Sequence, residues 1–154
     1  AERGVPAQQF AAVAALRPAS LSDFDRRIGA IASFVRLPEA EALAAADKRI
    51  RNILRKADGA VPDAVDPALL AEPAEQALAS AVDAAWAEAG PALARGDYVA
   101  ALARLAALRP EVDAFFDAVM VNAEDPALRG NRLALLQRLA RQLGAVAELG
   151  QLSA

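Results

Sequence analysis

Apolar residues at helical spacing, separated by helix-boundary residues, constrain the fold of this chain more than any other sequence feature. In residues 38–57, for example, one apolar face is formed by Leu43, Ala46, Ile50, Ile53 and Leu54. Strand character is confined to residues 118–122, which lie inside a helical pattern. The sequence therefore predicts an all-α fold, a helical bundle of about six helices.

Boundary residues place the individual helices. Ser20 with Asp23 resembles a capping box, Pro38 is typical of a first helical residue, and Asp97 and Asp125 are typical caps. A loop is expected over residues 58–72, where Asp66 and Pro67 open a short helical turn. The predicted helices are 1–19 (a lead-in helix), 21–36, 38–57, 73–96 with a disturbance at Gly90–Pro91, 97–121 with a bend or break at Pro110, and 126 to about 149.

Length and composition indicate one domain spanning residues 1–154. Hydrophobic residues make up 56% of the chain, but alanine supplies much of that fraction, so we expect closely packed, thin helices. No apolar run approaches the roughly 20 residues of a membrane span, and no signal-peptide pattern opens the chain. The absence of cysteine is typical of a cytoplasmic protein. Because the only methionine is Met120, we expect a fragment of a longer chain.

The residue inventory argues against a catalytic site. The chain has no cysteine and no histidine, which excludes thiol nucleophiles, the commonest zinc ligands and the usual proton shuttle. Its carboxylates, lysines and serines show no spacing typical of an acid–base pair or an activated nucleophile. Its eight glycines are scattered, so no phosphate-binding loop is present. We expect no catalytic residue, no metal and no cofactor.

Positive charge is concentrated in two segments, although the net charge is −3. Residues 47–56 contain five basic residues and one acid, and residues 126–147 contain four arginines and no acid. In the first segment the face opposite the apolar one carries Lys48, Arg49, Asn52, Arg55 and Lys56, with Arg51 at its border. Such a helix can pack on a bundle while it presents cations to a polyanion such as RNA, or to an acidic protein surface.

The arginines of the last predicted helix differ in their expected roles. Arg132 lies on the apolar stripe of that helix and would need an anionic partner if buried, for which Asp113 and Asp117 are candidates. Arg138 and Arg141 face outward and are free to bind a ligand. We therefore assign a structural role to Arg132 with Asp117, and a binding role to Arg138 and Arg141.

Two blocks of the sequence resemble a known family. The first block comprises residues 23–27 (DFDRR), 37–40 (LPEA) and 43–54 (LAAADKRIRNIL), and it resembles the C-terminal region of the bacterial glycyl-tRNA synthetase β subunit. The second comprises residues 96–98 (GDY), 112–117 (VDAFFD), 119–121 (VMV) and 128–133 (LRGNRL), and it resembles the DALR-type anticodon-binding fold, which arginyl-tRNA synthetase shares. One departure is Asp47, where the family usually has asparagine; if that asparagine touches RNA, the acid would weaken or reshape the contact.

The resemblance implies a non-catalytic domain that binds the anticodon region of glycine tRNA. It further implies that catalysis, an ATP-dependent glycylation of tRNA, belongs to a separate α subunit within an α2β2 complex in the cytoplasm. The RNA-binding candidates, chosen from the basic faces, are Lys48, Arg49, Arg51, Asn52, Arg55, Lys56, Arg138 and Arg141.

Three alternatives remain open at this point. An arginyl-type anticodon-binding domain would share the second block of residues. A helical protein-interaction module would use the basic helix for a protein partner. Such a module would not bind RNA, whereas RNA binding by an anticodon-binding domain would weaken steeply with salt. An unrecognised enzyme would require a cluster of mutually perturbed carboxylates in a cleft.

Overall fold

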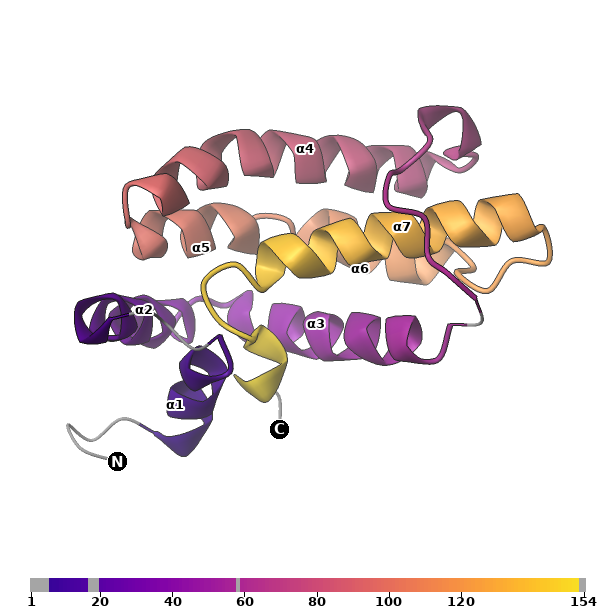
Figure 1. The fold of residues 1–154 in the computed structure, drawn as a ribbon. Helices are drawn as coiled ribbons and strands as arrows, with labels where there is room; N and C mark the ends of the chain where they lie inside the picture. The colour runs from indigo at the N-terminus through magenta and orange to yellow at the C-terminus, as the bar shows by residue number, and fades with distance from the viewer. Residues whose placement is uncertain (1–5, 17–19, 58, 153–154) are drawn as a thin grey trace.

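The computed structural model describes residues 6–16, 20–57 and 59–152, and within these ranges regular structure is helical throughout (Figure 1). This confirms the predicted all-α fold. The elements are α1 (Ala7–Ala14), α2 (Leu21–Phe34), α3 (Ala40–Arg55), the 3-10 helix η2 (Pro67–Leu69), α4 (Pro73–Ala94), α5 (Tyr98–Ala106), α6 (Arg109–Ala118), α7 (Pro126–Leu143) and the 3-10 helix η3 (Leu149–Leu152).

The helices pack around one apolar core. In Figure 1, α4 lies along α5 and α6, while α3 runs on the other side of α7 and contacts η3. The first and last elements, α1 and η3, lie against each other. Each of the seven described α-helices contributes fully buried side chains, among them Phe34, Leu43, Leu78, Phe115 and Leu139. The predicted packing of thin helices is visible in the many alanines of the same core.

Side-chain caps open four of the helical elements where the sequence predicts them. Ser20 Oγ accepts a hydrogen bond from the Asp23 amide at 3.0 Å, and Asp97 Oδ1 accepts one from the Ala100 amide at 3.2 Å. Asp66 and Asp125 accept bonds from the amides two residues later, each at 2.9 Å. A cap of this kind contributes about 1 kcal/mol, because it satisfies an amide that has no partner within the helix.

Several predicted boundaries were wrong. Helix α3 begins at Ala40 rather than Pro38, and α4 runs without interruption through Pro91. The break within 97–121 falls before Pro110, which lies in the first turn of α6, and α6 ends at Ala118. Of the predicted lead-in helix, residues 7–14 are helical, and residues 1–5 and 17–19 lie outside the described residues.

The last helix also ends earlier than predicted, at Leu143. Its continuation is replaced by tertiary hydrogen bonds: Arg27 Nη1 donates to the carbonyls of Ala145 and Val146 at 2.9 and 2.8 Å. The Glu148 amide donates to the Ala12 carbonyl at 2.9 Å. Since these partners come from α1 and α2, the local sequence around residue 144 could not reveal them.

Two further results concern the described residues as a set. None of their helices combines the length and apolarity that crossing a bilayer requires. Nor do three or more of their carboxylates gather in a way that would hold a metal ion.

Candidate nucleic-acid interface

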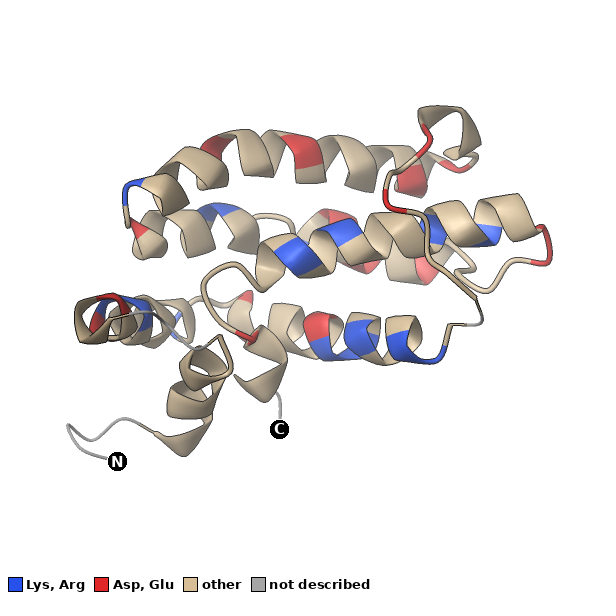
Figure 2. Ribbon diagram, in the orientation of Figure 1, with Lys and Arg blue, Asp and Glu red and all other residues tan. Residues whose placement is uncertain are grey.

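Helix α3 carries the densest basic segment of the chain and exposes most of it. Lys48, Arg49, Arg55 and Lys56 are exposed, whereas Arg51 and Asn52 are half-buried. Since successive residues are rotated by about 100°, these side chains fall on two flanks of the helix. One flank lines a cavity with the connection between α6 and α7, and the other lines a cavity with the second half of α7. The basic positions of α3 and α7 are blue in Figure 2.

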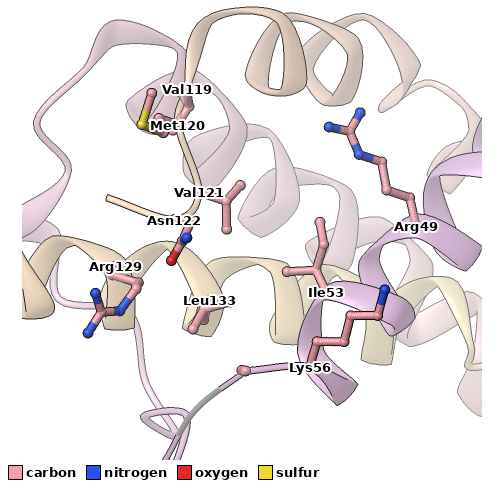
Figure 3. A pocket seen from close by; sticks show the side chains of 10 residues that line it. Arg49, Ile53, Lys56, Val119, Met120, Val121, Asn122, Arg129 and Leu133 are labelled. Atoms are coloured by element: carbon pink, nitrogen blue, oxygen red, sulfur yellow. The ribbon is translucent and has the colours of Figure 1, made fainter. Parts of the chain in front are cut away.

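The first flank borders a cavity of about 610 Å³, which we call the α3–α7 hollow (Figure 3). Its lining residues come from the end of α3, the connection after α6 and the start of α7: Arg49, Ile53, Lys56, Ala57, Val119, Met120, Val121, Asn122, Arg129 and Leu133. Every charged residue among them is basic. The hollow therefore combines apolar walls with three cations.

Two of these cations are held in place by neighbouring groups. The Arg49 guanidinium carbon lies 4.2 Å from the centre of the Phe116 ring, a cation–π geometry. Arg129 Nη1 donates a hydrogen bond to the Ala123 carbonyl at 3.2 Å. Both side chains are thus oriented at the edge of the hollow while retaining unused hydrogen-bond donors.

One edge of the hollow is anchored by Arg132, which is only 5% exposed. Arg132 Nη1 donates to the Met120 carbonyl at 2.6 Å, and Nη2 lies 2.9 Å from Glu75 Oε1 and 3.4 Å from Glu72 Oε2. Glu75 is fully buried. The guanidinium thereby ties the connection after α6 to both α7 and α4.

The expected partners of Arg132 were wrong. Asp113 instead pairs with Arg109 on its own helix at 3.4 Å, and Asp117 is exposed. Asp117 lines a shallow depression together with Asp113, Arg49 and Phe116, outside the reach of Arg132. The structural assignment of Asp117 is therefore not supported by its position, because Glu75 in α4 and Glu72, which precedes that helix, take that role.

The second flank of α3 borders another cavity, of about 580 Å³, which we call the α7 groove. It brings together three predicted RNA-binding residues, Arg51, Arg55 and Arg141, from two helices. Its remaining lining residues are Leu16, Leu54, Gln137, Ala140, Gly144 and Glu148. Unlike the hollow, this groove contains a carboxylate, and Arg51 Nε pairs with Asp47 Oδ2 at 3.0 Å.

The remaining predicted RNA-binding residues lie elsewhere on the surface. Arg138 is directed to α4, where its Nη2 lies 2.5 Å from Asp83 Oδ1, and it lines neither the hollow nor the groove. Lys48 is exposed on α3 between the two flanks. The side-chain oxygen of Asn52 accepts a hydrogen bond from Arg55. The eight candidates therefore do not form one continuous site.

Asp47 has no exposed surface, so its carboxylate does not lie where RNA can contact it. Its Oδ2 accepts hydrogen bonds from Arg51 Nε and from the Gly150 amide, both at 3.0 Å. Burial raises the pKa of the Asp47 carboxyl, an effect that the Arg51 charge and the two hydrogen bonds only partly offset. Asp47 fastens η3 to α3 rather than facing a ligand.

Sequence reasoning missed Arg129 and residues 119–122 as parts of the site. The exposed Met120, which is 70% accessible, lies in a segment that the periodicity assigned to a helix. The available signal was the run Val119 to Val121, whose strand-like character marks extended chain rather than a helix. Its neighbour in space, Ile53, is more than 60 residues away in sequence.

Comparison with known proteins shows the family of the chain. The family model described as the DALR anticodon binding domain matches residues 43–150, which include all lining residues of the hollow. The chain is 66% identical over 153 residues to the glycine--tRNA ligase beta subunit of Xanthomonas campestris pv. campestris, covering 99% of this chain and 22% of that protein.

Two other relatives carry the same name. Identity is 56% to the subunit of Leptothrix cholodnii and 53% to that of Xylella fastidiosa, in each case over 99% of this chain, and over 22% and 21% of the relative. The chain thus spans about a fifth of the length of these relatives. Because the family model covers well over half of the chain, the protein belongs to the DALR anticodon-binding domain family.

Proposed function

We propose that this chain binds the anticodon region of glycine tRNA as a non-catalytic part of a glycyl-tRNA synthetase β subunit. The observation that carries the proposal is the family match over residues 43–150, since this range contains the hollow and nearly all of the α7 groove. The names of the relatives favour glycine tRNA over arginine tRNA.

The electrostatics of the surface support a nucleic-acid ligand. Arg49, Lys56 and Arg129 line the hollow, and Arg55 and Arg141 line the groove beside it. Lys and Arg side chains that contact phosphates release bound counterions, which makes RNA binding both favourable and sensitive to salt. The acidic remainder of the chain would repel RNA, so binding would be restricted to the α3 and α7 faces.

The same proposal assigns the chemistry to other parts of the synthetase. ATP-dependent glycylation would occur in an α subunit of an α2β2 complex in the cytoplasm, with no cofactor bound by this domain. Its role would be to hold the tRNA so that the acceptor end reaches that catalytic centre. Binding energy made far from the reacting atoms contributes to catalysis in this way by positioning the substrate.

The test is a binding measurement with the 154-residue chain at two salt concentrations. The ligands are glycine tRNA, the same tRNA with a substituted anticodon, and arginine tRNA. We expect the tightest binding to unmodified glycine tRNA and a steep loss of affinity at the higher salt concentration.

Each alternative has its own outcome in this measurement. Preference for arginine tRNA would replace the glycyl assignment by an arginyl-type domain. Equal, salt-sensitive binding to all three RNAs would contradict anticodon recognition. Absence of binding even at low salt would contradict the proposal and favour a helical protein-interaction module.

A further inference from the structure

Resting on the proposed function, we propose that the α3–α7 hollow receives one unstacked nucleobase of single-stranded RNA, whereas the α7 groove contacts only the phosphate backbone. Both cavities are cationic and their volumes are similar, about 610 and 580 Å³, but the hollow is the more enclosed of the two. Both volumes fall within the range of about 300–1,000 Å³ typical of small-molecule sites. What distinguishes them is the arrangement of apolar, amide and acidic groups.

The hollow has an apolar interior that suits the face of a base. Ile53 from α3 and Val121 from the connection after α6 point into it, with Leu133 of α7 beside them (Figure 3). Met120, 70% exposed, adds a flexible and polarizable side chain at the edge. Single-stranded RNA is recognised mainly through bases that are turned out of the stack and packed against protein side chains.

Asn122 supplies the group that can read the edge of a base. Its side chain is exposed and lines the hollow, and it makes no hydrogen bond to any other described residue. A carboxamide offers a donor and an acceptor side by side, which matches the paired acceptor and donor positions along a base edge. The α7 groove has an amide as well, Gln137, but it lies within α7 and is half-buried.

The charges around the hollow fit a nucleotide better than those of the groove. Arg49, Lys56 and Arg129 surround the apolar interior without a lining carboxylate, so flanking phosphates meet cations only. In the groove, Glu148 repels an anion and the Arg51 charge is already paired with Asp47. Arg55 and Arg141 of the groove can still contact backbone phosphates, because such contacts do not require a shaped pocket.

The hollow is formed before any ligand binds, because buried groups hold its edge. The Met120 carbonyl accepts a hydrogen bond from Arg132, whose own position is fixed by Glu75. Similarly, the Asn131 side chain exchanges two hydrogen bonds with the Asp66 backbone, at 2.7 and 3.1 Å, and so fixes the loop before η2. A preformed site avoids much of the entropy cost of ordering a loop on binding.

The experiment uses an RNA hairpin with the anticodon stem and loop of glycine tRNA, and a set of hairpins that each lack one anticodon-loop base. The variants are Met120→Ala and Asn122→Ala, both at exposed positions outside the helices, with Val99→Ala as the control for loss of an exposed apolar side chain. We expect each variant to bind the intact hairpin about ten-fold more weakly, with an unchanged salt dependence. On one abasic hairpin, both variants and the wild-type chain should bind equally.

The outcomes separate this inference from the proposed function. If the wild-type chain discriminates anticodons but both variants bind the intact hairpin as tightly as the wild type, the base site is not the hollow and the tRNA proposal stands. A ten-fold loss that persists on every abasic hairpin likewise overturns the inference. If the wild-type chain binds none of the hairpins and no tRNA, both proposals fall.

Discussion

The Arg132 side chain is almost completely buried. Oxygen atoms of three other residues take the place of water around its guanidinium. They are a carboxylate oxygen of Glu75 in α4, one of Glu72 just before α4, and the Met120 carbonyl. Removing one member of a buried ion pair costs more than the pair itself contributes, because the remaining charge stays buried without compensation. Here the remaining charge would be that of Glu75, which has no exposed surface.

We therefore expect Arg132→Met to lower the free energy of unfolding by about 3–5 kcal/mol, measured by urea denaturation. The double variant Arg132→Met with Glu75→Leu should recover much of that loss, since both buried charges are then gone. Arg138→Ala, which breaks the exposed pair with Asp83, is the control and should cost less than about 1 kcal/mol. Equal losses in the single and double variants would show that the ion pair is not the cause.

Asp47 gives a prediction of pH dependence. Because burial raises its pKa, the native state takes up a proton at higher pH than the unfolded state, whose ordinary value is 3.8. Proton uptake by Asp47 consequently favours the native state as pH falls through the raised pKa, and this contribution is absent at neutral pH. The variant Asp47→Asn has no carboxyl group at this position and so gains no stability from proton uptake.

The free energy of unfolding of Asp47→Asn, compared with that of the wild type, should therefore be highest at neutral pH. This difference should become less favourable to the variant as pH falls toward about 4. The measurement is urea denaturation of both chains from pH 7 to 4, with the exposed Asp113→Asn as the control. A stability difference that is constant over this range would contradict a raised pKa for Asp47.

At the scale of the elements, α4 contains one glycine inside the helix and is followed by another. The Cβ of an alanine at position 90 would lie 3.6 Å from Trp86 Nε1, an ordinary contact. At position 96 the backbone has φ +76°, and a Cβ would lie 2.5 Å from Arg26 Nη1. Gly96 therefore ends α4 in a conformation that alanine adopts poorly, whereas Gly90 only weakens the helix.

These positions predict opposite effects of the same substitution. Gly90→Ala should raise the free energy of unfolding by about 0.5–1 kcal/mol, because alanine loses less backbone entropy in a helix. Gly96→Ala should lower it by about 1 kcal/mol or more, because alanine rarely adopts the positive φ at this position. Denaturant unfolding of both variants checks this, and a stabilising Gly96→Ala would contradict the assigned end of α4.

The element scale also shows what the sequence can predict. The starts of α2, α5 and α7 were predicted well, since caps such as Ser20 and Asp125 act on amides two or three residues away. The end of α7 was not, because Arg27 takes the carbonyls that follow from more than 100 residues away. The cations of α3 were predicted from helical periodicity, but the hollow was not, since it exists only where three distant segments meet.

For the whole molecule, the distribution of charge decides which face a polyanion can approach. Figure 2 shows basic residues along α3 and α7 and acidic ones along α4. A test of this polarity must avoid Arg51, because its loss would leave buried Asp47 without its ion pair. Arg55 and Arg141 are both exposed and serve better.

We expect Arg55→Ala with Arg141→Ala to weaken RNA binding and to reduce the slope of log affinity against log salt by about 1.4 to 1.8. Helicity measured by circular dichroism should not change. The charge-matched control is Arg36→Ala with Arg95→Ala, whose exposed side chains line neither cavity. An equal effect of both pairs would mean that total charge, rather than the α7 groove, governs binding.

The adjacent residues Asn131 and Arg132 have a consequence for the order of folding. Asn131 fixes the loop before η2, and Arg132 fixes the connection after α6. Both loops therefore depend on two neighbouring residues of α7. Arg132 in turn needs Glu75, which becomes available only when α4 and α7 have docked. Helices can form within about a microsecond, whereas the capacity to accept a base would arise only once α4 and α7 have docked. A refolding experiment would then show helical signal before RNA-binding competence, with the interval set by the docking of one helix pair.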